Sequence, residues 1–322
     1  MKITAVETAF PLAEVLTISR GSRTEARVVT VTVERDGITG HGESVPYARY
    51  GETVDGVIAE IMALEGDFAN GLTRMELQSK LAGGAARNAL DCAVWDWEAK
   101  NAGERASVMA GVPHMGPEIT AYTLSLADAD TMRAKAAEHA HRPLLKVKLG
   151  GEGDLARLRA VREGAPNTDI IIDANEGWDA ATYTELAPVL EELGVKMVEQ
   201  PMPAGDDEVL ATLDRILPVC ADESCHDRAS LPGLEGKYDM VNIKLDKTGG
   251  LTEALALKRA AEDAGFAIMV GCMVGSSLAM APATLLAQGA AFSDLDGPLL
   301  LSLDRDRPLK FVDNGVHPPE PA

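Results

Sequence analysis

Six ionisable residues in the second half of the chain could carry chemistry, because each follows a short apolar run and they recur at near-regular intervals. They are two lysines and four carboxylates: Lys148, Asp173, Glu199, Asp222, Lys244 and Asp294. The intervals are 25, 26, 23, 22 and 50 residues, the last spanning two of the others. A strand, a loop and a helix together take about this length, so the spacing predicts successive βα units of a barrel. Residues at the carboxyl ends of barrel strands converge on one pocket.

Three of the carboxylates suggest a metal site. Asp173, Glu199 and Asp222 would lie on consecutive strands, where convergent carboxylates repel one another unless a cation lies between them. Three hard oxygen ligands with open positions suit Mg²⁺, and water or substrate oxygens would complete the octahedron. The alternative of three separate surface acids is disfavoured, because each follows an apolar strand and precedes turn-forming residues.

The lysines suggest proton transfer. On strands two and six of eight, Lys148 and Lys244 would face each other across the metal, which suits removal of a proton from one face of a carbon and its return to the other. The metal would hold a substrate carboxylate and stabilise the enediolate. Lys146 shares the strand face of Lys148 and would be an electrostatic helper. Nearby cations should push a lysine towards its neutral, basic form. A Schiff-base lysine is the rival mechanism.

The elements that must position these residues form two blocks. Residues 1–45 predict an antiparallel sheet with a turn at Asp36-Gly37, and the polar segment 19–26 predicts a mobile loop. Residues 52–66 and 73–103 have helical spacing, which makes the first block α+β. From about residue 118, short strands alternate with helical segments, the pattern of parallel strands with crossovers. Residues 307–322 are expected to return to the first domain as a strand with a frayed end.

Composition limits the class of protein. A chain of 322 residues with 46% hydrophobic residues can form a barrel and a smaller domain. A net charge of −20 argues against nucleic acid or anionic membrane as a partner. No signal peptide or membrane span is expected, so a cytoplasmic enzyme is the default. The four cysteines fit neither a disulfide framework nor a paired zinc motif.

The motifs together resemble the enolase superfamily, muconate-lactonizing subgroup. The resemblance is carried by KVK at 146–148, by Asp/Glu/Asp on successive strands and by KLDKTGG at 244–250. Enolase-superfamily sites are an established example of a Lys or His base working with Mg²⁺. ISRGSR, GHGESVPYARYGE, GGAARNALDCAVWD, NIKLDKTGGLTEALAL and DLDGP are similar to the L-Ala-D/L-Glu epimerase family, over essentially the whole chain.

The resemblance implies both a fold and an activity. The fold is a modified (β/α)7β barrel over residues 118–302 with an N-terminal α+β capping domain over 1–117, which residues 303–322 join. The activity is reversible epimerisation of L-Ala-D-Glu to L-Ala-L-Glu at the glutamyl α-carbon, in murein peptide recycling. Lys148 and Lys244 would be the acid/base residues, and Asp173, Glu199 and Asp222 would bind one Mg²⁺.

The resemblance also implies how a small dipeptide would be bound. Asp294 and Asp296 match an Asp-x-Asp that receives the free α-ammonium, a role that suits paired carboxylates. Arg23 matches a residue that contacts the side-chain carboxylate of the second amino acid, and Arg20 is its rival. The other residues expected near the substrate are Thr123, Lys146, Cys272, Met273 and Val274. Many subgroup members have Glu where this chain has Gly275, so no catalytic role is expected there.

Other functions stay open. An o-succinylbenzoate synthase, an N-acylamino-acid racemase, a cycloisomerase or an epimerase of another dipeptide would use the same bases and metal. A non-catalytic metal-binding paralogue is a different class, although every chemical position is filled. The sequence leaves open which dipeptide is bound and whether the protein forms a homo-oligomer.

Overall fold

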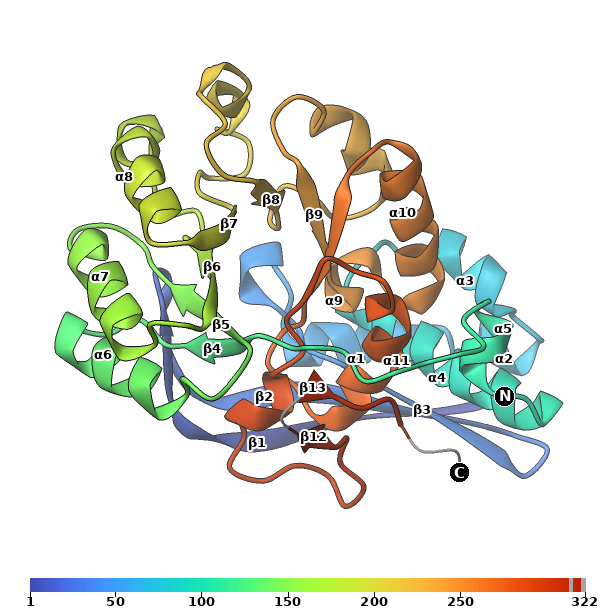
Figure 1. Cartoon of the computed structure of the whole chain (residues 1–322). Coiled ribbons are helices and arrows are strands. Elements are labelled where there is room, and N and C mark those ends of the chain that lie inside the picture. The colour runs from blue at the N-terminus through green and yellow to red at the C-terminus, as the bar shows by residue number, and fades with distance from the viewer. Residues whose placement is uncertain (313–314, 320–322) are drawn as a thin grey trace.

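The computed structural model describes residues 1–312 and 315–319 of the chain (Figure 1). A long antiparallel sheet and a group of helices lie beside a barrel of parallel strands with helices around it. Within the described part of the chain, none of the helices has the length and apolar character needed to cross a membrane.

The N-terminal sheet consists of β1 (Lys2–Ile18), β2 (Gly21–Arg35) and β3 (Ile38–Ser44), all antiparallel. The expected mobile loop at 19–26 lies almost wholly in β2, because β1 and β2 continue as a hairpin that pairs Leu16 with Arg23. Thr17 anchors this hairpin to the barrel, since its backbone N–H donates to Ser125 Oγ at 2.8 Å. The polar residues that suggested a loop instead form a hairpin end directed at the barrel.

The helices of the first block follow this sheet. They are η1 (Ala48–Tyr50), α1 (Val54–Ala63), α2 (Glu65–Ala69), α3 (Arg74–Lys80), α4 (Ala85–Ala102) and α5 (Ala106–Met109). The expected helix over 73–103 is two helices, because the chain leaves helical geometry at Leu81 and Gly84 has a positive φ of 137°. A side chain on Gly84 would approach Glu52 Oε1 to 2.6 Å. Glycine here lets the chain turn into α4.

Helix α4 packs very closely on β3. A Cβ on Gly42 would overlap the carbonyl oxygen of Ala89 and approach Ala93 N to 2.8 Å. Gly42→Ala should therefore destabilise the protein by about 1–3 kcal/mol, because rigid helix backbone must move. Gly66→Ala is the control, since Gly66 is helical and a Cβ there has no neighbour within 4 Å. Thermal unfolding should show a lower Tm for Gly42→Ala alone, and equal Tm values for the two variants would contradict this packing.

The barrel has eight parallel strands that follow one another in chain order. They are β4 (Tyr122–Leu124), β5 (Leu144–Lys148), β6 (Asp169–Asp173), β7 (Val195–Glu199), β8 (Val219–Ala221), β9 (Met240–Ile243), β10 (Ala267–Val270) and β11 (Phe292–Ser293). A bridge between Thr120 and Ser293 joins the first and last strands and closes the barrel.

Seven crossovers connect these strands, which confirms the (β/α)7β topology. The α-helices among them are α6 (Ala129–Glu138), α7 (Asp154–Gly164), α8 (Ala180–Glu192), α9 (Leu245–Thr248), α10 (Leu251–Asp263) and α11 (Ser277–Ala287). The crossovers after β7 and β8 have short 3₁₀ helices instead, η2 (Glu208–Thr212) and η3 (Arg228–Gly233), and η4 (Gly297–Leu300) follows β11.

The barrel interior is layered. Its apolar layer is a buried cluster with one side chain from each of six strands and one from the residue before β4, namely Ala121, Leu144, Ile171, Met197, Cys220, Met240 and Met269. Since side chains alternate along a strand, the residue two positions further on points into the same interior. For β5, β6 and β7 that residue is on the strand and is charged, and for β8 it is a charged residue directly after the strand: Lys146, Asp173, Glu199 and Asp222. The charged residues therefore lie in the next layer of the barrel interior, directly above the apolar layer.

In its described residues, 307–312 and 315–319, the C-terminal segment does not return to the first sheet as a strand, so that expectation is wrong for this part of the chain. Instead, β12 (Phe311–Val312) pairs with β13 (Gly315–Val316), and Val316 bridges Glu118 just before the barrel. The segment does reach the first sheet through a side chain, because Arg305 forms an ion pair with the buried Glu43 of β3. The expected frayed end includes residues 320–322, which lie outside the described residues. The division of the chain at 117/118 stays a prediction.

Candidate active site

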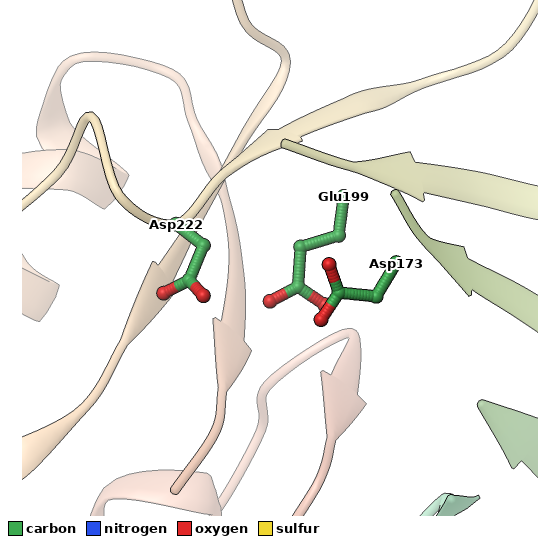
Figure 2. A group of neighbouring side chains, drawn as sticks. All are labelled: Asp173, Glu199 and Asp222. Carbon is green, nitrogen blue, oxygen red and sulfur yellow. The ribbon is translucent and has the colours of Figure 1, made fainter. Parts of the chain in front are cut away.

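Three carboxylates converge at the carboxyl ends of neighbouring barrel strands. Asp173 ends β6, Glu199 ends β7 and Asp222 directly follows β8. Figure 2 shows the three side chains directed toward one another, and one ligand atom from each lies within 4.8 Å of the others. All three are buried, with at most 2% of each residue exposed. Such a cluster of hard oxygen atoms could hold one divalent cation.

Two lysines approach this cluster from opposite ends. Lys148, on the second barrel strand, places Nζ 2.6 Å from Asp173 Oδ2. Lys244, which follows the sixth strand, places Nζ 2.6 Å from Asp222 Oδ2. The two lysines therefore contact the two outer carboxylates, with Glu199 between them in strand order.

A third lysine lies beneath the cluster. Lys146 Nζ is 2.7 Å from both Glu199 Oε2 and Asp294 Oδ2, and 3.2 Å from Asp173 Oδ2. Its side chain is only 1% exposed. Such a buried cation is tolerated because several carboxylates surround it.

The electrostatics of the cluster depend on which charges are neighbours. Burial disfavours the charged form of Lys244, but attraction to Asp222 and Glu199 outweighs it, and its pKa lies well above the usual value. Burial raises the pKa of Asp222, yet Lys244 and Lys247 together hold it well below its usual value. Burial and the Asp173 charge raise the pKa of Glu199 to about 7. The expectation that nearby cations push a lysine towards its neutral form stays a prediction, because the charges that dominate around Lys244 here are those of carboxylates.

A cavity opens beside the cluster, between the β1–β2 hairpin and the barrel. The expected substrate-contacting residues all line it: Arg23, Thr123, Lys146, Cys272, Met273, Val274, Asp294 and Asp296. Lys148, Lys244 and Asp222 line the same cavity, so the two lysines and one of the three candidate metal ligands open into one space.

Asp294 and Asp296, just after β11, form a second acidic pair on the wall of this cavity. Asp294 uses Oδ2 for Lys146, whereas its buried Oδ1 has no hydrogen-bond donor among the described residues. Asp296 Oδ2 accepts a 2.6 Å hydrogen bond from Thr123 N. Burial and the Asp294 charge raise the pKa of Asp296 to about 7. The pair would be stabilised by a cationic donor that reached Asp294 Oδ1.

The structure distinguishes the two arginines of the hairpin. Arg20 NH1 donates to Asn175 O at 3.1 Å, and Arg20 NH2 lies 2.8 Å from Glu223 Oε1. Arg23 lies over the Tyr47 ring at 5.6 Å, and it forms no ion pair with any residue in the described part of the chain. Arg20 therefore ties the hairpin to the barrel, whereas the Arg23 guanidinium is free to meet a ligand in the cavity.

Several residues that support the cluster were not singled out from the sequence. Asn242 Nδ2 donates to Glu199 Oε1 at 2.6 Å, and Lys247 Nζ donates to Asp222 Oδ1 at 2.7 Å. The sequence offered a clue to each of them. Asn242 lies on β9, two residues before Lys244, and Lys247 is the second lysine of KLDKTGG.

The backbone next to the carboxylates is also unusual. Asn175 and Gln200 have positive φ values of 47° and 34°, although neither is glycine. Gln200 Oε1 in turn accepts from the backbone N–H of Asp222 at 2.9 Å. Strained backbone of this kind gathers at functional sites and is held by its surroundings.

Comparisons with known proteins agree with this architecture. The N-terminal domain model of mandelate racemase/muconate lactonizing enzyme matches residues 1–109, and the enolase C-terminal domain-like model matches 128–320. The chain is 46% identical to the L-Ala-D/L-Glu epimerase of Escherichia coli K12, over 97% of this chain and 98% of that one. It is 44% identical to the N-acetyl-D-glutamate racemase of Pseudoalteromonas sp., over 90% and 92% of the two chains.

Solved structures are similar throughout. An enolase family member from Agrobacterium tumefaciens, solved with sodium and L-Ala-L-Glu, is 55% identical, with a TM-score of 0.97 over 98% of this chain and 97% of that one. The dipeptide epimerase of Enterococcus faecalis V583, solved with Mg and L-Leu-L-Tyr, is 27% identical, with a TM-score of 0.92 over 100% and 97%.

Fold and site together define an enolase-type barrel protein with a capping domain. More narrowly, the chain belongs to the mandelate racemase/muconate lactonizing enzyme family, in the group that contains the L-Ala-D/L-Glu epimerases.

Proposed function

We propose that this protein is a Mg²⁺-dependent dipeptide epimerase that interconverts L-Ala-D-Glu and L-Ala-L-Glu. The observation that carries the proposal is the approach of Lys148 and Lys244 to one carboxylate cluster from opposite ends, inside a cavity that also holds the Asp294/Asp296 pair. A cytoplasmic location, a role in murein recycling and the division into residues 1–117 and 118–302 belong to the same proposal.

The carboxylate cluster fits the proposed ion. Asp173, Glu199 and Asp222 are oxygen ligands, which Mg²⁺ prefers, and Glu199 Oε2 is a buried oxygen with an ion pair but no well-directed hydrogen bond. When bound, the ion would hold the dipeptide's terminal carboxylate and supply positive charge that stabilises the negative charge left as the α-proton departs.

The lysines perform the proton transfer. One of Lys148 and Lys244 removes the α-proton of the glutamyl residue from one face, and the other donates a proton to the opposite face. Reversal exchanges these roles, so one pair of lysines serves both directions. Lys146 remains protonated, because Glu199, Asp173 and Asp294 surround it and the pKa of this buried lysine is held well above its usual value.

The cavity walls position the two ends of the dipeptide. The free α-ammonium would donate to Asp294 Oδ1 beside Asp296, and the glutamyl side-chain carboxylate would meet Arg23. Thr123 and residues 272–274 would border the backbone of the substrate. Opposite charges on opposite cavity walls then select a dipeptide that has an ammonium at one end and an acidic side chain at the other.

An N-acylglutamate racemase is the second candidate, because a relative with 44% identity is named an N-acetyl-D-glutamate racemase. An acylated amino acid has no ammonium, so it would leave the buried Asp294 Oδ1 without a donor. An unsatisfied buried polar group costs about 1–3 kcal/mol. This cost favours the dipeptide.

Solvent exchange tests the proposal directly. The protein is incubated with Mg²⁺ in D₂O with L-Ala-L-Glu, other L-Ala-L-Xaa dipeptides or N-acetyl-L-Glu, and NMR follows both loss of the α-proton signal and growth of the epimer. L-Ala-L-Glu should react fastest, and a chelator should stop the reaction until Mg²⁺ is restored. Exchange of N-acetyl-L-Glu alone, or of no dipeptide in the panel, would overturn the proposed substrate.

A further inference from the structure

We infer that Lys247 and Asn242 make the metal site selective for Mg²⁺ over Ca²⁺, because they occupy one oxygen of Asp222 and of Glu199 and leave each carboxylate a single oxygen for the ion. This inference rests on the proposed metal site. It concerns which ion the chain accepts, a property that is measured without any substrate.

The same pattern recurs at all three carboxylates. Asp173 Oδ1 accepts from Asn175 N at 2.9 Å, Glu199 Oε1 from Asn242 Nδ2 at 2.6 Å, and Asp222 Oδ1 from Lys247 Nζ at 2.7 Å. Among the described residues, the cationic contacts of the second oxygens, Asp173 Oδ2, Glu199 Oε2 and Asp222 Oδ2, are with Lys146, Lys148 and Lys244, which all line the cavity. Each carboxylate thus has one oxygen committed to a supporting donor and one on the side of the candidate ion.

Lys247 holds Asp222 Oδ1 in place because its own ammonium group is fully hydrogen-bonded. Its buried Nζ donates to Asp222 Oδ1, to the backbone carbonyl of Asp222 at 2.5 Å and to the backbone carbonyl of Asn242 at 2.9 Å. Three acceptors satisfy the three N–H groups of an ammonium. Both residues are buried, so rotation of the Asp222 carboxylate would break one of these bonds and leave a buried N–H group without its acceptor, which fixes the carboxylate orientation.

Asn242 joins this support to the neighbouring ligand. Its side chain orients Glu199 while its carbonyl accepts from Lys247, so one residue of β9 supports two ligands. The next strand makes room for it, because a Cβ on Gly271 would lie 2.6 Å from Asn242 Oδ1. Glycine at 271 therefore leaves the amide in the orientation that donates to Glu199.

Single-oxygen coordination distinguishes the two ions. Mg²⁺ requires near-octahedral geometry, and three single oxygens leave three positions for water and substrate. Ca²⁺ takes about 6–8 oxygen ligands and commonly uses both oxygens of a carboxylate. A site that withholds the second oxygen of each carboxylate therefore favours the smaller ion.

Two variants test this step by different routes. Lys247→Met removes a charge and three donors, whereas Asn242→Leu removes one donor without changing the charge. Metal-free protein is titrated with Mg²⁺ and separately with Ca²⁺ by calorimetry, and the ratio of the two Kd values is compared with that of the unmodified protein. The ratio is the readout, because loss of the lysine charge should strengthen the binding of both divalent ions alike. Each variant should shift it towards Ca²⁺ by about tenfold, the scale on which residues behind a metal ligand act.

Lys258→Met is the matched control, because Lys258 is partly buried and donates to the carbonyls of Leu286 and Gln288 away from the site. Its ratio should equal that of the unmodified protein. A ratio unchanged in both variants, while the unmodified protein binds Mg²⁺, overturns only the selectivity inference. Binding of neither ion by the unmodified protein overturns the metal site and the inference together. Should Lys247→Met fail to fold, a shifted ratio in Asn242→Leu supports the inference and an unchanged ratio overturns it.

Discussion

Replacing Lys244 by alanine should abolish epimerisation and still leave α-proton exchange from one epimer only. Lys148 remains in this variant, so it can remove the proton from its own face and return a deuteron to that same face. Lys148→Ala should give the mirror result with the other epimer. Loss of an acid/base group lowers a rate by about 10²–10⁴-fold, and epimerisation needs both groups. Exchange into L-Ala-L-Glu and L-Ala-D-Glu is measured separately by NMR in D₂O.

The result depends on intact metal binding, because Lys244 Nζ contacts Asp222 Oδ2 and Lys148 Nζ contacts Asp173 Oδ2. Mg²⁺ titration of each variant checks this before exchange is interpreted. Lys237→Ala is the control, since Lys237 is also a buried lysine paired with a carboxylate, Asp207 at 2.7 Å, but does not line the cavity. It should still epimerise. Equal exchange of both epimers by a single-lysine variant would contradict the two-base assignment.

The sequence was sufficient to locate the residues that stand inside the barrel. A strand that is apolar and then ends in a charge places that charge at the barrel mouth, and alternation decides which face it takes. Lys146 and Asp173 follow this rule, two residues after the buried Leu144 and Ile171. The barrel fold thus brings residues from distant parts of the chain together around one cavity.

The supporting contacts could not be predicted in this way. Asn242 and Lys247 gain their partners only when β7, β8, β9 and α9 are placed together. A polar residue beside a known motif does not by itself indicate which acceptor it will meet. The ion pair that distinguishes Arg20 from Arg23 likewise depends on the position of Glu223 in the fold. The segment 19–26 forms a hairpin end and not the predicted loop, and polar residues give the same sequence signal in both.

The charge on Asp294 should decide whether a free ammonium is required. Asp294→Asn should lower kcat/KM for L-Ala-L-Glu by about 10²-fold, because hydrogen bonds to a charged group contribute about 1.5–3 kcal/mol and Oδ1 has no other donor among the described residues. Propionyl-L-Glu has the same shape but lacks the ammonium. It should be a poor substrate for the unmodified protein, and Asp294→Asn should not lower its kcat/KM much further.

Asp294 also forms an ion pair with Lys146 Nζ at 2.7 Å. Measuring Asp294→Asn with both substrates separates the proposed ammonium contact from this ion pair. If the variant acts only through Lys146, it should slow both substrates by the same factor, whereas loss of the ammonium contact should slow only the dipeptide. Asp304→Asn is the control, since Asp304 accepts from Ser277 N at 3.0 Å and does not line the cavity. Equal losses for the two substrates would remove the ammonium contact and, with it, the main reason to prefer a dipeptide over an acylated amino acid.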